Sequence, residues 1–237
     1  MKSNKTAVLL ALSMSLAGSC GKSGGGSSKS PNPQQETVQD LAQAPEGSYR
    51  SIIRPFNTKL NGWIPAGIAD IKIVGDQVQV SLQLDDDGHV NHFQNIHIGT
   101  KCPTDKSDFN GDGMVDINEA YRVAGPALIP LDNDLDSQVG GGVFPMGSNR
   151  EPGRFYRSVY NETGSYKKLM ADLSTGTAGP SLAKLSSGDR INLAGKVIII
   201  HGTEANTATP IPASVGTINN MPTHLSIPIA CGVITKD

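Results

Sequence analysis

Residues 108–119 contain a regular series of short oxygen-bearing side chains. Oxygen donors stand at positions 1, 3, 5, 9 and 12 of this segment, namely Asp108, Asn110, Asp112, Asp116 and Glu119. Met114 at position 7 would contribute its backbone carbonyl, and Gly113 at position 6 permits a sharp turn. Calcium is a hard cation that takes about six to eight oxygen ligands, so this spacing predicts a calcium loop. The alternative is an acidic surface turn.

The segments that flank this EF-hand-type loop limit its expected role. A sensor EF-hand has a helix on each side, but residues 102–104 include a proline where the incoming helix would be, and only residues 119–123 favour an outgoing turn. Asp132, Asp134 and Asp136 alternate without the glycine or final glutamate of a second loop, so a solvated turn is favoured over a weak second site. We therefore expect calcium to be structural, with an affinity of about 10⁻⁴ to 10⁻³ M.

The first twenty residues have the pattern of an export signal. Two lysines precede an apolar run at residues 7–16, which is too short to span a bilayer, and small residues then lead to Cys20. This ending resembles the lipobox of bacterial lipoproteins, although Ala17 stands where leucine is usual. The resemblance implies that Cys20 is lipidated and becomes the first residue of the mature chain. The alternative is an ordinary secretory signal cut near residues 17–19.

The domain organisation follows from this signal at residues 1–20. Residues 21–48 are rich in Gly, Ser, Pro and Gln and predict a flexible tether, which leaves residues 49–237 as the folded domain. We expect a lipid-anchored protein of the bacterial envelope, and Gly21 favours the outer membrane by analogy with Gram-negative sorting rules; the face of that membrane stays open. The mature part has 18 basic and 22 acidic residues, so no nucleic-acid partner is expected.

The composition predicts an all-β fold. Aromatic residues make up only 5% of a chain with 27 Gly and 15 Pro, which favours short strands joined by turns. Residues 69–85 predict a hairpin, because apolar residues alternate with polar ones on both sides of Gly75. Further strands are expected at residues 93–98, 193–200 and 226–234. Residues 126–180 predict a long loop region with one helix at residues 166–173.

Three further segments carry histidines or cysteines. They are residues 92–97 followed by Cys102, residues 184–201 ending in His201, and residues 229–234 around Cys231. In order and distribution they resemble the copper-ligand and disulfide segments of Cu,Zn superoxide dismutases, over roughly residues 50–237. The resemblance implies an eight-stranded Greek-key β-sandwich or barrel with a disulfide between Cys102 and Cys231. Thiols of exported proteins normally pair; two buried free thiols are the alternative.

The histidines depart from the pattern of that family. His97 and His201 match two copper-ligand positions, but Asn95 stands where the enzymes have a third histidine. No histidine lies between Cys102 and His201, so the family's zinc ligands are missing, and the calcium loop lies where the zinc loop would be. His224 could join His97 and His201 in a three-histidine site, since imidazoles suit copper, zinc, iron or nickel. The alternative is that these histidines are purely structural.

These features favour a non-enzymatic, calcium-binding envelope lipoprotein with a superoxide dismutase-like domain, and no residue is nominated as catalytic. A second hypothesis is a copper-dependent redox protein that acts on superoxide or a related small oxidant through His97, His201 and His224. A third is an envelope binding module, for which the sequence gives no specific feature. The sequence suggests no particular protein partner.

Overall fold

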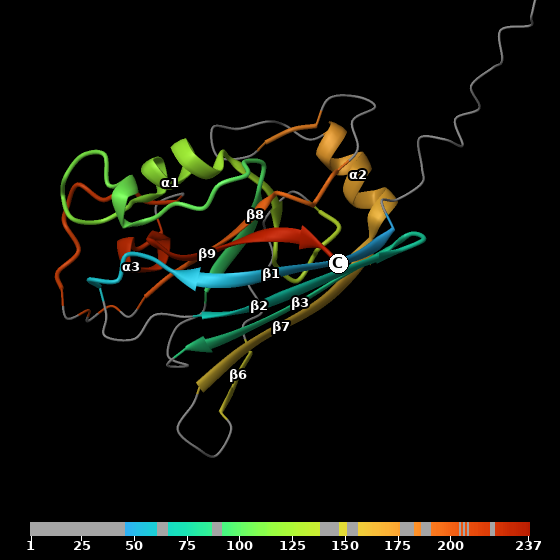
Figure 1. The fold of residues 1–237 in the computed structure, drawn as a ribbon, viewed down its shortest axis with the longest axis horizontal. Coiled ribbons are helices and arrows are strands. Elements are labelled where there is room, and N and C mark those ends of the chain that lie inside the picture. Colours follow the sequence, from blue (N-terminus) through green and yellow to red (C-terminus); the bar gives the residue numbers. More distant parts are fainter. Residues whose placement is uncertain are drawn as a thin grey trace, which may run out of the picture. The chain divides into compact units, whose positions relative to one another are not determined.

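A computed structural model describes residues 46–237 with several gaps (Figure 1). The gaps are residues 61–65, 87–91, 138–146, 151–155, 176–182, 186–190, 204, 206, 208, 219 and 220, and the side chains of residues 86, 147–150 and 156–159 are also not described. The expected signal, Cys20 and nearly all of the expected tether therefore lie outside the described residues. All described residues belong to one compact unit.

The described part of the chain is all-β, as predicted, with a single antiparallel sheet in the strand order β5-β4-β8-β9-β1-β2-β3-β7-β6. The strands are β1 (Gly47–Pro55), β2 (Ala66–Val74), β3 (Gln77–Asp86), β4 (Phe93–His97), β5 (Ala127–Pro130), β6 (Gly147–Arg150), β7 (Tyr156–Ser165), β8 (Val197–His201) and β9 (Pro228–Lys236). The α-helices are α1 (Ile117–Ala124), α2 (Tyr166–Thr175) and α3 (Thr223–Ser226).

The chain connects these strands in a Greek-key order. Strands β1, β2 and β3 are sequential neighbours, and the chain then crosses to the other half of the sheet to form β4 and β5. It returns for β6 and β7 beside β3, and crosses again for β8 and β9. Because β9 pairs with both β8 and β1, it joins the two halves of the sheet.

The main apolar core lies between the two halves of the sheet. The β2–β3 hairpin contributes every second residue to it, as the alternating pattern predicted: the buried side chains are Ala69, Ile71, Ile73, Val78, Val80, Leu82 and Leu84. Strands β4, β8 and β9 contribute residues such as Ile96, Ile198 and Ile229 to the same core. Helix α2, predicted at residues 166–173, is confirmed and packs its buried leucines here.

A second, smaller apolar core lies on the opposite face of β8 and β9. It consists of Phe56, Val115, Ala120, Ala124, Val197, Ile199 and Cys231, with Cys102 packed against it. Residues from α1 and the preceding loop supply one side, and alternate residues of β8 and β9 supply the other. Cross-strand partners in a sheet share a face. This face therefore also carries His97, the partner of Val197, and Asn95, the partner of Ile199.

Two expectations for the middle of the chain were wrong. Residues 126–180 contain α2 but also the strands β5, β6 and β7, where a long loop was expected. Strand β7 pairs along its full length with β3, so cross-strand pairing stabilises it although its sequence is largely polar. The expected outgoing turn of the loop at residues 119–123 is a complete helix, α1, while only a short 3₁₀ turn at Asp105–Ser107 precedes the loop. No described helix is long and apolar enough to cross a membrane.

Candidate metal sites

The last residue of the predicted calcium loop folds back onto its beginning. Oε1 of Glu119 accepts hydrogen bonds from the amides of Phe109 at 2.6 Å and Asn110 at 3.0 Å. Its other oxygen, Oε2, accepts from the Asp116 amide at 3.0 Å. The carboxylate at position 12 therefore lies beside positions 2 and 3, as expected of a loop that closes around a cation.

The earlier oxygen donors are held in place by amides within the loop. The two oxygens of Asp108 accept from Gly111 and Gly113, each at 2.8 Å. Asn110 and Asp112 each accept from the amide two residues further along the chain. Gly111 and Gly113 have φ values of 74° and 93°, a region that suits glycine, so the predicted sharp turn is confirmed.

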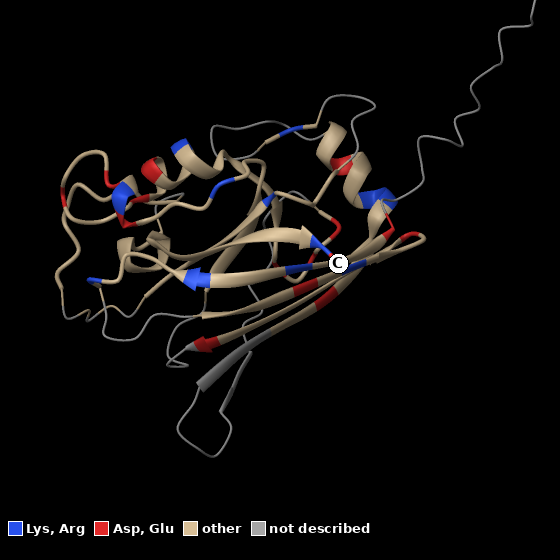
Figure 2. Ribbon diagram, viewed as in Figure 1, with Lys and Arg blue, Asp and Glu red and all other residues tan. Residues whose placement is uncertain are grey.

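Position 9 of the loop is also the N-cap of α1. Asp116 Oδ1 accepts from the Glu119 amide at 3.0 Å, which forms a capping box with the reciprocal bond from Glu119. Val115 at position 8 is fully buried in the second core and anchors the loop there. Figure 2 shows acidic positions on this loop and at the start of α1.

Residues distant in sequence fasten the loop to the domain. The buried side chain of Asn57 bonds to the backbone of Val115, and the backbone amide of Asn57 donates to Asp105 Oδ1 at 2.6 Å. On the other side, Ser214 Oγ donates to Asp112 Oδ2 at 2.5 Å. Although partial burial opposes the shift, hydrogen bonds from Ser214, Met114 and Asn110 lower the pKa of Asp112. The sequence alone gave no signal for Asn57 or Ser214.

His97 and His201 lie together at the ends of two neighbouring strands, β4 and β8. Both are completely buried, and their ring centroids are 6.5 Å apart. Each ring is oriented through Nδ1, which lies 2.8 Å from the Gly125 carbonyl in His97 and 2.9 Å from the Ser226 carbonyl in His201. A carbonyl can only accept a hydrogen bond, so Nδ1 carries the proton and Nε2 has the free lone pair.

The two Nε2 atoms are buried without a hydrogen-bond partner among the described residues. Burial lowers the pKa of His97 to about 4 and that of His201 to about 3, so both rings are neutral near pH 7. A neutral imidazole whose other nitrogen donates to a carbonyl is the usual form of a histidine metal ligand. The two side chains therefore fit a transition-metal ion.

The third predicted ligand, His224, lies on α3 and is partly exposed. The structure brings His97 and His201 together, and completion of the set by His224 stays a prediction. Asn95 lies on the same face as His97 and is buried, with no described partner for Nδ2. His92 is buried, and its Nδ1 lies 3.1 Å from the His201 carbonyl.

Within the described residues, no three His, Cys, Asp or Glu side chains already surround a common metal position. The four carboxylates of the predicted loop, Asp108, Asp112, Asp116 and Glu119, are therefore not gathered around one point, and each accepts hydrogen bonds from backbone amides. In the acidic alternation at residues 132–136, Lys168 forms ion pairs with Asp134 and Asp136. Asp132 is fully buried, so the expectation of a solvated turn was wrong for this residue.

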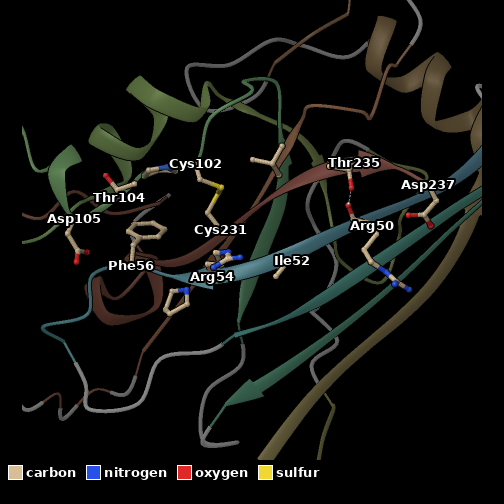
Figure 3. A pocket seen from close by; sticks show the side chains of 13 residues that line it. Arg50, Ile52, Arg54, Phe56, Cys102, Thr104, Asp105, Cys231, Thr235 and Asp237 are labelled. Carbon is tan, nitrogen blue, oxygen red and sulfur yellow. Dashed lines mark hydrogen bonds between the residues drawn. A yellow bond between two sulfur atoms is a disulfide. The ribbon is translucent and has the colours of Figure 1, made fainter.

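The predicted disulfide between Cys102 and Cys231 is present, with a Cα–Cα distance of 5.6 Å. It ties the segment before the calcium loop to β9 and lines a surface pocket of about 540 Å³. Figure 3 shows Arg54 and Phe56 beside the two sulfur atoms. The pocket is a feature that a binding module could use, and that third hypothesis stays a prediction.

No protein-family model and no curated protein matches the chain.

Proposed function

We propose that this chain is a calcium-binding lipoprotein of the bacterial envelope, in which calcium holds a long loop against a superoxide dismutase-like β-sandwich. The observation that carries the proposal is the return of Glu119 to the start of the loop. A carboxylate at position 12 has to make this return to complete a calcium site that begins at Asp108. The proposal assigns the ligands Asp108, Asn110, Asp112, Met114, Asp116 and Glu119.

A structural role for calcium is supported by the attachments of the loop. The disulfide ties the segment that precedes the loop to β9, and Asn57 ties Val115, in the second half of the loop, to the segment after β1. Carboxylates gathered in one loop repel each other, and a divalent cation relieves that repulsion. Calcium would thus stabilise a segment whose two ends are already fixed.

The superoxide dismutase-like assignment is supported by three independent features. These are the Greek-key strand order, the pairing of Cys102 with Cys231, and the meeting of His97 and His201 on neighbouring strands. The lipid anchor at Cys20 is proposed from the sequence alone. In this proposal the tether holds the folded domain close to the outer membrane.

Isothermal titration calorimetry with Ca²⁺ tests the proposal on the full chain purified in detergent. Wild type should bind one Ca²⁺, and the variant Asp108→Ala with Glu119→Ala should give no binding heat. Asp134→Ala with Asp136→Ala is the matched control, because it removes the same charge from the ion-pair network with Lys168 and should still bind. Equal heats from wild type and the loop variant would refute the calcium site.

The buried histidine pair supports a second candidate function, the binding of a copper ion. The two buried Nε2 atoms, which have no hydrogen-bond partner in the part of the chain that the structure describes, carry a desolvation cost that a metal ion would offset. His97 and His201 would hold the metal through Nε2, while Gly125 and Ser226 orient the rings through Nδ1. Bound copper would supply one-electron redox chemistry, the basis of the superoxide-handling alternative.

Metal analysis of protein purified without added metal tests this candidate. We expect stoichiometric copper in wild type and its loss from His97→Ala with His201→Ala. A parallel His224→Ala variant shows whether the partly exposed histidine completes the ligand set, since loss of copper there would establish a third ligand. Absence of copper from the wild-type protein would contradict copper binding by the histidine pair. If copper is present, a superoxide-consumption assay then tests the redox activity.

A further inference from the structure

Two chains of hydrogen bonds connect the predicted calcium loop to the histidine pair. We propose that calcium bound at residues 108–119 positions the imidazoles of His97 and His201 to receive a transition-metal ion. This inference rests on the proposed calcium binding and gives the calcium a second role. Calcium would not only fasten the loop but also set the affinity of a separate site.

The first connection is helix α1. The helix begins at the capping box of Asp116 and Glu119, and it ends at Gly125, whose carbonyl accepts the hydrogen bond from His97. The ring of Tyr121, on the same helix, lies edge-on to His97 with centroids 5.2 Å apart. An eight-residue helix moves as one rod, so a shift of its first turn reaches its C-cap.

The far end of α1 is tightly docked on the segment after β4. The Gly99 amide donates to the Ala124 carbonyl at 2.7 Å, and a Cβ added at Gly99 would lie 2.3 Å from that oxygen. Because backbone contacts backbone here, no side chain can absorb a displacement of the helix. This docking holds the Gly125 carbonyl beside His97, so the orientation of the His97 ring depends on where α1 lies.

The second connection runs through residues 214–218 and then through Ser226. Two predicted calcium ligands hold its start: Asp116 Oδ2 accepts from the Gly216 amide at 2.8 Å, and Asp112 accepts from Ser214. Further along, the Ile218 amide donates to Oγ of the fully buried Ser226 at 3.1 Å. The Ser226 carbonyl then accepts from Nδ1 of His201.

Asp112 and Asp116 can serve both purposes at once. A carboxylate offers about four lone-pair positions, so one oxygen can accept an amide or hydroxyl hydrogen bond while the group also contacts a cation. Without calcium, repulsion among the loop carboxylates would loosen both connections together. Coupling of this kind is reciprocal, so a transition metal at the histidines would raise calcium affinity by the same factor, for which we expect about tenfold.

Imidazole NMR of the metal-free full chain in detergent, labelled with ¹⁵N-histidine, provides the direct test. Addition of Ca²⁺ should shift the ring signals of both His97 and His201 with the midpoint that calorimetry gives for calcium. Titration with Cu²⁺ as the probe should then show about tenfold tighter binding in calcium-loaded than in calcium-free protein. If calcium binds but neither ring signal nor Cu²⁺ affinity changes, the coupling is wrong and the proposed calcium site stands. If calcium gives no heat, the proposed function itself fails.

A variant of Ser226, measured at saturating calcium, tests the second connection independently of the first. Ser226→Ala deletes the Oγ link to Ile218 but leaves every predicted calcium ligand and the Ser226 carbonyl in place. We expect the His201 ring signals to change and those of His97 to stay, whereas Ser174→Ala in α2 should change neither. Unchanged His201 signals in Ser226→Ala would overturn the second connection.

Discussion

Asn57 and Val115 form two hydrogen bonds with each other. The Val115 amide donates to Oδ1 of Asn57 at 2.7 Å, and Nδ2 of Asn57 donates to the Val115 carbonyl at 2.8 Å. The same Nδ2 donates to the Pro228 carbonyl at 2.7 Å. One buried side chain thus joins the segment after β1, position 8 of the predicted calcium loop and the start of β9. Asn57 has a φ of 57°, a conformation that asparagine adopts more readily than most residues.

Removal of this side chain should weaken both the fold and the loop. Asn57→Ala would leave three buried backbone groups without a partner, so we expect the free energy of unfolding to fall by about 3 kcal/mol. Calcium affinity should fall as well. Urea unfolding measures the first effect and calorimetry the second. Asn161→Ala, an exposed asparagine in β7, is the control, and equal losses in the two variants would contradict the assigned role.

Loss of the disulfide should be still more costly. Cys102 and Cys231 are 129 residues apart, and on the chain-entropy model a loop of this length stabilises the folded state by about 5 kcal/mol. Cys102→Ser with Cys231→Ser should therefore unfold at much lower urea concentration than wild type. Cys20→Ser should unfold like wild type. A double variant as stable as Cys20→Ser would show that the bridge contributes little.

The buried histidines predict acid sensitivity of the metal-free protein. Burial lowers the pKa of His97 to about 4 and that of His201 to about 3, whereas an unfolded histidine has a pKa of about 6.5. Between these values the unfolded chain binds more protons, so stability is fully present above pH 6.5 and is lost as the pH falls. The urea midpoint should drop steeply from pH 7 to pH 4.5. Replacement of both histidines by glutamine should flatten the profile, and an unchanged slope would contradict the burial argument.

Gly125 and Gly75 offer a matched test of how tightly α1 is docked. Both have positive φ, 70° and 56°, but a Cβ at Gly75 meets nothing within 4 Å, whereas a Cβ at Gly125 would lie 2.7 Å from Cγ2 of Ile98. Gly75→Ala should lower stability by about 1 to 2 kcal/mol through backbone strain alone. Gly125→Ala should cost more, because its ψ of 176° adds backbone strain to the contact with Ile98, and it should also move the His97 ring signal in NMR. Equal costs would show that the C-terminal end of α1 can move freely.

Some strands of this fold could be predicted from the sequence and others could not, for physical reasons. The hairpin of β2 and β3 was predictable because one face is buried, so apolar residues alternate with polar ones around Gly75. Strand β1 was not predicted, although Tyr49, Ser51 and Ile53 face inward, because a polar Ser51 interrupts its pattern. In β7 the buried Tyr160 is a weak apolar signal, and the strand depends on pairing with β3.

The same difference holds for the candidate sites. The closed turn at residues 108–119 could be predicted because its oxygen-bearing residues are contiguous and regularly spaced, while its binding of calcium stays a prediction. The supports of the histidine rings could not, because Gly125 and Ser226 act through backbone carbonyls, which any residue has. Asn57 was missed for a related reason: its partners are 58 and 171 residues away, and backbone groups leave no trace in a sequence.

The central position of β1 has a mechanical consequence. In a chain anchored at Cys20, any pull from the membrane would reach the folded domain at Gly47, the first residue of this strand. Strand β1 lies between β2 and β9 and is hydrogen-bonded to both. Tension along the strand would therefore load two ladders in shear at the same time, and neither could be opened one bond after another. Such an attachment point resists extraction far better than a strand at the rim of the sheet.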